Sequence, residues 1–282
     1  MEWCWLNGHV MPLAEARVGV EDRGFQFADG VYEAVRLYNG KPFELSRHMD
    51  RLERSCGGIR LGLPIDKASL VSEIMKLIGR AAIPEGFVYL QVTRGPAPRS
   101  HLFPENPSPT VLFYIRALPP VPGVGRGSAY RLLSVNDERW NKCWIKSIAL
   151  LENTIARTAA AEAGADEAIF IHNGVVTEGT TSNIFMVSRG KIITHPLGPK
   201  VLPGVTRDVL IECAAKLGIE VQQRGMLLEE AKRSEEVFVT SSTRELVWVS
   251  RWDEAKIGDG TCGPVATQLH LAYRDRVTAI SA

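Results

Sequence analysis

Lys146 lies in the stretch CWIKSIALL, where it follows an aromatic and an apolar residue and precedes a hydrophobic segment. Apolar surroundings remove water from a lysine and favour its neutral amine, which can form a Schiff base with a carbonyl compound. A lysine near the start of a helix usually extends its ammonium group into water instead. Lys146 by itself is therefore a candidate nucleophile whose role other residues must decide.

Glu178 lies at the end of an apolar strand in the stretch VTEGTTSN, directly before a run of small polar residues. A carboxylate at the end of a buried strand needs a partner, and a protonated pyridine nitrogen would be one. The alternative is an exposed glutamate in a simple serine–threonine turn.

The stretch LPGVTRD places a Gly-Val-Thr turn directly before a predicted helix. The backbone N–H groups of Val205 and Thr206, together with the Thr206 hydroxyl, would face any ligand there, and helix N-termini favour phosphate. Taken alone, Thr206 is more simply explained as the cap of its own helix.

A second stretch, VTSSTRE, brings the hydroxyls of Ser241 and Ser242 to the end of a predicted strand, and Arg51 in RHMDRLERS could balance the charge of an anion. The simpler alternative for the serines is a polar turn. For Arg51 it is a solvated helix face, because Asp50 and Glu53 are close in the sequence. Neither candidate anion site carries a Walker-type glycine pattern.

The stretch GPAPRSHLFP, residues 95–104, contains three prolines and one glycine within ten residues. Proline fixes φ and reduces the disorder that a loop must lose, so this segment is expected to form a stiff arm. Arg99 and His101 lie within it, and together they could bind a negatively charged group. The alternatives are an exposed loop arginine and a structural histidine.

Composition excludes several classes of function. The 282 residues carry a formal net charge of +1, with 45% hydrophobic and 23% charged residues, so no strong field favours nucleic acid or an anionic membrane. The sequence lacks an apolar run long enough for a transmembrane helix and a signal-peptide pattern at its start. An odd number of scattered cysteines predicts a reduced, cytoplasmic setting with neither a disulfide scaffold nor a zinc site: Cys4, Cys56, Cys143, Cys213 and Cys262.

Several hairpins and strands are expected. Asn-Gly pairs between apolar runs are strong signals for tight hairpin turns, and they occur at residues 7–8, 39–40 and 173–174. Strands are expected in the stretches GFVYLQVTRG, TVLFYIRAL, YRLLSVNDERW, EAIFIHNG, NIFMVSRGKIITH (as one strand) and EEVFVTSS.

Helices are expected at four places: after a cap at Ser46, over residues 66–80, from about Ser147 to Gly164, and over residues 206–218. The mixture of hairpins and helices, without strict alternation, favours an α+β fold. A proline- and glycine-rich stretch divides the chain, which predicts three parts: a small N-terminal α/β domain at residues 1–117, a linker at 118–125 and a larger domain at 126–282.

Five stretches resemble the class IV pyridoxal-phosphate aminotransferases in order and spacing across nearly the whole chain: DRGFQFADGVYEAVRLYNGKPFELSRHMDRL, IKSIALL, VTEGTTSNIF, LPGVTRDVL and VFVTSSTRE. The resemblance implies a two-domain, fold-type IV enzyme with mixed sheets and helices packed against them. Within this family, TRGPAPRSHLFPEN is similar to the arm of the D-amino acid aminotransferases. The expected activity is transfer of the amino group of a D-amino acid, such as D-alanine, to a 2-oxo acid.

The resemblance also implies roles for the candidate residues toward pyridoxal 5'-phosphate. Lys146 would bind the cofactor covalently, and Glu178 would keep its pyridine nitrogen protonated. Leu202 would support one face of the ring. The phosphate would be bound by Arg51, Val205, Thr206 and Ser242, and Ser241 would also bind the cofactor.

Tyr32, Arg99 and His101 would trap the carboxylate of the substrate, with Arg99 and His101 reaching in from the partner subunit of a homodimer. In this interpretation, the arm binds the α-carboxylate of an amino acid. An (R)-amine lacks that group, so the arm argues against an amine transaminase.

Some residues depart from the pattern of the D-amino acid enzymes, namely Ala149, Glu152, Trp248 and Glu254. They put the side-chain specificity in doubt but not the lysine chemistry. The alternatives within the family are an (R)-amine transaminase, a branched-chain L-amino acid transaminase and an aminodeoxychorismate lyase. A protein that binds the cofactor without catalysis is a more remote alternative.

Overall fold

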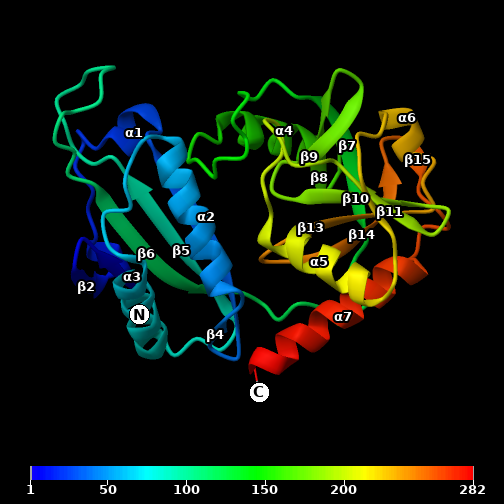
Figure 1. Cartoon of the computed structure of the whole chain (residues 1–282), viewed down its shortest axis with the longest axis horizontal. Helices are drawn as coiled ribbons and strands as arrows, with labels where there is room; N and C mark the ends of the chain where they lie inside the picture. Colours follow the sequence, from blue (N-terminus) through cyan, green and yellow to red (C-terminus); the bar gives the residue numbers. More distant parts are fainter. Residues whose placement is uncertain (1, 282) are drawn as a thin grey trace. The chain divides into compact units, whose positions relative to one another are not determined.

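The computed structural model describes residues 2–281, which form two compact units. Unit 1 contains the chain up to Pro120, the short segment Ile145–Ala149 and the residues from Ile280 onward, whereas unit 2 contains Val121–Trp144 and Leu150–Ala279. Each unit has its own sheet with helices packed against it (Figure 1), which confirms the expected α+β class. The chain thus leaves unit 1, returns to it for five residues, and leaves it again.

Unit 1 is built on a six-stranded antiparallel sheet. Two of the predicted Asn-Gly turns close its hairpins, and all four turn residues, Asn7, Gly8, Asn39 and Gly40, have the positive φ that such tight turns require. The order across the sheet is β2 (His9–Pro12), β1 (Trp3–Leu6), β6 (Thr110–Ala117), β5 (Gly86–Thr93), β3 (Gly30–Tyr38) and β4 (Lys41–Pro42).

The helices of unit 1 are η1 (Leu13–Glu15), α1 (Arg23–Phe27), α2 (Leu45–Gly58) and α3 (Lys67–Ala81). The side chain of Asp66 caps α3 by accepting from Ser69 N, and this helix confirms the prediction for residues 66–80. The prediction that Ser46 caps α2 is wrong, because the helix begins at Leu45 and its N-cap is Glu44, which has a positive φ and makes no side-chain cap. Buried side chains of α2, α3 and the sheet form one apolar core.

Unit 2 contains a nine-stranded mixed sheet. The parallel pairs are β7–β8, β7–β14 and β11–β12, and the remaining pairs are antiparallel. The order is β12 (Val221–Gln223), β11 (Lys191–Thr194), β10 (Asn183–Ser188), β13 (Glu236–Ser241), β14 (Glu245–Trp252), β7 (Tyr130–Asn136), β8 (Glu167–His172) and β9 (Val175–Gly179), with β15 (Ala255–Lys256) beside β14.

The expectation of one long strand after Asn183 is wrong. The chain turns at Arg189 and Gly190, both with positive φ, and makes the hairpin of β10 and β11. Arginine rarely adopts this conformation, so the turn has no clear signal in the sequence.

The remaining helices are α4 (Leu151–Glu162), α5 (Val205–Lys216), α6 (Leu228–Ala231) and α7 (Pro264–Ser281). Helix α4 begins later than predicted, because Ser147 forms an antiparallel bridge with Val31 of β3 and its neighbours Lys146 and Ile148 form backbone hydrogen bonds with the same strand. All five cysteines are free thiols. Among residues 2–281, no helix has the length and hydropathy needed to cross a membrane.

Candidate active site

Lys146 lies in the short segment that returns to unit 1. Its carbonyl accepts a hydrogen bond from Tyr32 N at 2.9 Å, and its own N–H donates to Ser55 Oγ at 3.2 Å. The ammonium nitrogen Nζ is 4.0 Å from the centroid of the Tyr32 ring. The structure therefore brings together two of the residues that the sequence singled out, and it holds the lysine backbone on both sides.

Arg51 is buried on α2 rather than exposed on a solvated face, so that alternative is wrong. Its Nε and Nη2 each donate to a different oxygen of Glu33, both at 2.7 Å, and His48 Nδ1 lies 2.7 Å from the same carboxylate. Burial by itself would raise the pKa of Glu33, but Arg51 and His48 outweigh it and hold that pKa well below its ordinary value. The acidic neighbours of Arg51 in the sequence, Asp50 and Glu53, pair with another residue, Lys67.

Sequence reasoning missed Glu33 and His48. A signal was present, because Glu33 interrupts the apolar strand β3, and His48 and Arg51 are three residues apart on one helix. The cluster fixes the position of Arg51, whose predicted role toward a phosphate stays a prediction.

Arg99 and His101 project from the proline-rich arm of unit 1, and both side chains are exposed. The guanidinium carbon of Arg99 is 4.5 Å from the ring centroid of Phe27, and the ring of His101 is 5.5 Å from the same centroid. Both side chains are thus gathered around one aromatic ring, in an arrangement suited to a shared anionic ligand.

Glu178 lies near the end of β9 and is 4% exposed, so the alternative of an exposed turn glutamate is wrong. Its carboxylate accepts hydrogen bonds from Arg139 Nη1 at 2.7 Å, from the backbone N–H of Leu202 at 2.9 Å and from Asn183 Nδ2 at 3.2 Å. Burial raises its pKa, and the nearby guanidinium of Arg139 opposes that effect.

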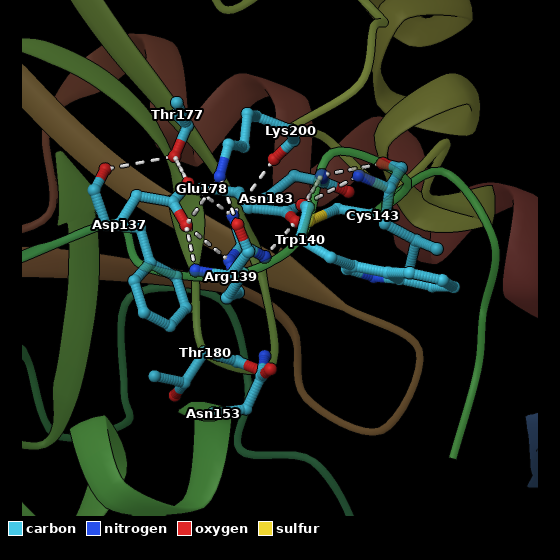
Figure 2. Close-up of polar contacts among 12 residues, drawn as sticks. Asp137, Arg139, Trp140, Cys143, Asn153, Thr177, Glu178, Thr180, Asn183 and Lys200 are labelled. Carbon is cyan, nitrogen blue, oxygen red and sulfur yellow. Dashed lines mark hydrogen bonds and ion pairs between the residues drawn. The ribbon is translucent and has the colours of Figure 1, made fainter. Parts of the chain in front are cut away.

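Arg139 is the centre of this network (Figure 2). Its Nε and Nη2 donate to the two oxygens of Asp137 at 3.0 and 2.9 Å, while Nη1 points to Glu178. Lys200 Nζ donates to the carbonyl of Arg139 and lies 3.6 Å from Asp137. Sequence reasoning missed these three residues, although Asp137 and Arg139 lie in the stretch that leads to Lys146.

The stretch after Arg139 is held to the segment before α5. The N–H of Cys143 donates to Pro199 O at 2.7 Å, and its Sγ donates to Trp140 O at 3.2 Å. Burial raises the pKa of the Cys143 thiol to about 11, which leaves it protonated near neutral pH.

The N-terminus of α5 presents Val205 and Thr206 in its first turn. Gly204 is the N-cap and makes no side-chain cap, so Thr206 is not the cap of its own helix. A Cβ on Gly204 would lie 2.0 Å from Oδ1 of Asn183, which requires glycine at this position. Amide groups at the start of such a helix face outward and suit an anion.

Ser241 ends β13, and Ser242 follows it in the turn to β14. Glu245, just after this turn, is fully buried with a positive φ. His270 Nε2 lies 2.7 Å from one of its oxygens and Arg274 donates to the other at 2.6 Å, so α7 fixes the position of the turn.

The chain is similar to known proteins over nearly its whole length. Among curated proteins, the D-alanine aminotransferase of Bacillus licheniformis is 36% identical over 276 residues, covering 98% of this chain and 97% of that protein. The D-alanine aminotransferase of Listeria innocua is 40% identical over 279 residues, covering 96% and 95%.

Among solved structures, the branched-chain amino acid aminotransferase of the archaeon Thermoproteus uzoniensis with norvaline superposes with a TM-score of 0.87 at 25% identity, covering 98% of this chain and 95% of that one. Another branched-chain amino acid aminotransferase, solved with pyridoxamine 5'-phosphate, superposes with a TM-score of 0.91 at 27% identity, covering 98% and 94%.

The family model of class IV amino-transferases matches residues 30–252. This match includes Tyr32, Arg51, Lys146 and Glu178, and it confirms the expected family and fold. The chain belongs to the class IV aminotransferases.

Proposed function

We propose that the chain is a pyridoxal-phosphate-dependent transaminase that transfers the amino group of a D-amino acid, such as D-alanine, to a 2-oxo acid, such as 2-oxoglutarate. One observation carries the proposal: Arg99 and His101 gather around Phe27 in a chain whose relatives, at 34–40% identity over nearly full length, are named D-alanine aminotransferase.

The contacts of unit 2 fit the chemistry of the cofactor. The buried carboxylate of Glu178 suits a protonated pyridine nitrogen, because Arg139 gives it only one of its N–H groups. The outward amides of Val205 and Thr206 suit a phosphate, and the hydroxyls of Ser241 and Ser242 would add to them. Leu202, whose N–H orients Glu178, would support one ring face.

In unit 1, Arg51 would supply a further donor to the phosphate. When bound, the cofactor supplies an electron sink that weakens the Cα–H bond of the substrate. Lys146 would hold the cofactor, then remove the proton from the substrate Cα as a general base and return a proton as a general acid. Glu178 would hold the proton on the pyridine nitrogen throughout.

The arm would bind the α-carboxylate of the substrate. Arg99 can donate two parallel hydrogen bonds to a carboxylate, with His101 and the Tyr32 hydroxyl completing the trap. A fixed carboxylate and a lysine acting from one side select one enantiomer. We further propose a homodimer in which Arg99 and His101 act in the site of the partner, and a reducing, cytoplasmic setting that suits five free cysteines.

Absorbance spectroscopy of the purified protein tests the proposal. We expect a yellow protein whose absorbance at about 400 nm is bleached by D-alanine. Bleaching by L-valine alone would favour a branched-chain L-amino acid transaminase, the activity named for the two solved structures. Bleaching by an (R)-arylamine alone would favour an amine transaminase, and a colourless protein would contradict the proposed cofactor.

Two variants test the proposed roles of Lys146 and Arg99. Lys146→Ala should abolish turnover with every substrate. Arg99→Gln should lower kcat/KM for D-alanine by about one to two orders of magnitude, since a charge-assisted hydrogen bond contributes about 1.5–3 kcal/mol. An Arg99→Gln variant as active as the wild type would show that Arg99 does not bind the substrate carboxylate.

A further inference from the structure

We propose that Arg23, Phe27, Asp29 and Arg94, which together we name the arm cradle, hold Arg99 and His101 in the conformation that binds the substrate carboxylate. This inference rests on the proposed function of the arm, whose proline-rich residues 95–104 continue to residue 109 in the loop between β5 and β6. All four cradle residues belong to unit 1, as does the arm. They are positioning residues: Arg23, Phe27 and Arg94 contact the arm, and Asp29 acts through the two arginines.

The base of the arm is closed by the backbone. Gly95 has a φ of +85°, and a Cβ there would lie 1.7 Å from the carbonyl oxygen of Ser108, so the two ends of the arm meet closely. The N–H of Arg23 donates to Gly95 O at 3.0 Å, and the N–H of Ala97 donates to Glu21 O at 3.2 Å. The first residues of α1 and the first residues of the arm therefore form one ordered junction.

Arg23 reaches from this junction to the tip of the arm. Its Nη1 donates to Ser100 O at 2.6 Å and to Leu102 O at 3.3 Å, the two carbonyls on either side of His101. Arg23 is 3% exposed, and its Nε donates to Asp29 Oδ2 at 2.8 Å. A buried guanidinium with such partners fixes the backbone of His101, because moving the arm would leave its donors without acceptors.

Arg94 completes the cradle by binding the same carboxylate of Asp29 as Arg23. Its Nε and Nη2 donate to Asp29 at 2.8 and 3.0 Å, and Nη2 also donates to Ile59 O at 2.6 Å. The guanidinium carbon lies 3.7 Å from the ring centroid of Phe103, an arm residue. Asp29 thus positions two arginines: Arg23 binds the backbone of the arm, and Arg94 contacts the ring of Phe103.

Phe27 orients the two side chains that the proposed function uses. Its ring has Arg99 at 4.5 Å and His101 at 5.5 Å, and Arg23 approaches it at 4.7 Å. One aromatic ring thereby limits the rotamers of both side chains. Because the ordering exists before any substrate arrives, less conformational entropy is lost on binding.

Two readouts on the full-length protein test the cradle. Trypsin cutting at the Arg99–Ser100 bond, followed by mass spectrometry, measures order in the arm. Single-turnover bleaching by D-alanine and by D-alaninol, which lacks the carboxylate, gives a ratio that reports carboxylate recognition. Arg23→Gln should speed cutting at this bond about tenfold and lower the ratio about tenfold.

Phe27→Leu should change both readouts in the same direction, and it decides the matter if Arg23→Gln fails to fold. Arg17→Gln is the matched control, because Arg17 is exposed and its hydrogen bonds go to the nearby carbonyls of Ala14 and Ala16. It should match the wild type in both readouts.

The outcomes separate the inference from the proposed function. The proposal for the cradle is wrong if the Arg23 and Phe27 variants match the Arg17 control in both readouts. It is also wrong if Arg99→Gln lowers the ratio but the cradle variants change only one of the two readouts. If Arg99→Gln itself leaves the ratio unchanged, the assignment of the arm to the carboxylate fails first, and the cradle fails with it.

Discussion

Two buried arginine clusters, the Arg51 cluster of unit 1 and the Arg139 cluster of unit 2, distribute charge in opposite ways. Arg51 directs two N–H groups to the single carboxylate of Glu33, whose pKa is lowered despite complete burial. Arg139 directs most of its donors to Asp137 and one to Glu178, whose pKa is raised by burial. Both carboxylates are buried, so the number of cationic donors that each one receives decides whether its pKa lies below or above its ordinary value.

The difference explains why one carboxylate is structural and the other suits a ligand. Glu33 is fully matched by a guanidinium and His48, so it anchors α2 to β3. Glu178 is under-compensated, so an arriving cation such as a pyridinium would stabilise it further. The same residue types can thus make a carboxylate whose charge is fully compensated, as in the Arg51 cluster, or one that can still accept a cation, as in the Arg139 cluster.

The largest expected effect on stability comes from disrupting the Arg139 cluster. Arg139→Gln leaves the buried carboxylates of Asp137 and Glu178 without their shared cation, and we expect a loss of about 3–5 kcal/mol in the free energy of unfolding. Urea unfolding followed by circular dichroism measures it. A loss below about 1 kcal/mol would mean that the carboxylates are not both ionised.

Glu33→Gln should have the next largest effect. It leaves Arg51 buried beside a neutral amide, which should lower the free energy of unfolding by about 3 kcal/mol. Glu85→Gln is the control, because Glu85 also pairs with a buried arginine, Arg36, but is itself 29% exposed. Equal losses in the two variants would show that burial of the carboxylate is not what makes the first pair important.

The Arg51 cluster also predicts that the stability of the protein depends on pH. Burial lowers the pKa of His48, so the unfolded chain binds a proton more readily below about pH 6.5, and stability falls there as the pH decreases. Glu33 has a lowered pKa, so its contribution is present above about pH 4.3 and is lost progressively below it. Urea midpoints at about pH 7, 5 and 4 should decrease in that order, given these ordinary pKa values. In a His48→Gln variant the decrease between about pH 6.5 and 5 should be smaller.

The smallest effect is expected at an exposed pair. Lys76 and Glu73 lie 2.6 Å apart on α3, but the lysine is 68% exposed. Glu73→Gln should change the free energy of unfolding by about 0.3 kcal/mol, close to the limit of a urea titration. A change as large as that for Glu33→Gln would contradict the view that burial makes such ion pairs important.

Local sequence signals predicted much of the fold. The Asn-Gly turns were found because these residues adopt positive φ, and α3 because its apolar residues recur at helical spacing. The start of α4 was missed because residues near Ser147 pair with β3, a tertiary contact that overrides helix propensity.

The sequence predicted candidate residues for the site but not the charged residues that hold them in place. Lys146 and Glu178 follow recognisable patterns, and Tyr32, which was expected in the same site, lies beside Lys146. Arg139, Asp137 and Glu33 were missed because a charged residue in a single sequence gives no sign of the partner it will meet after folding. A buried charge network becomes visible only through tertiary geometry.

The brief return of residues 145–149 to unit 1 has a consequence for biosynthesis. Tyr32 N–H donates to Lys146 O, and the N–H of Ile148 donates to Gly30 O, so part of β3 lacks its partners until this segment has been made. A fragment ending at Pro120 would leave these backbone groups exposed and would omit the lysine. The N-terminal unit can therefore reach its final state only after residue 149 has left the ribosome, and severing the chain between Pro120 and Ile145 would separate Lys146 from the strand that holds it.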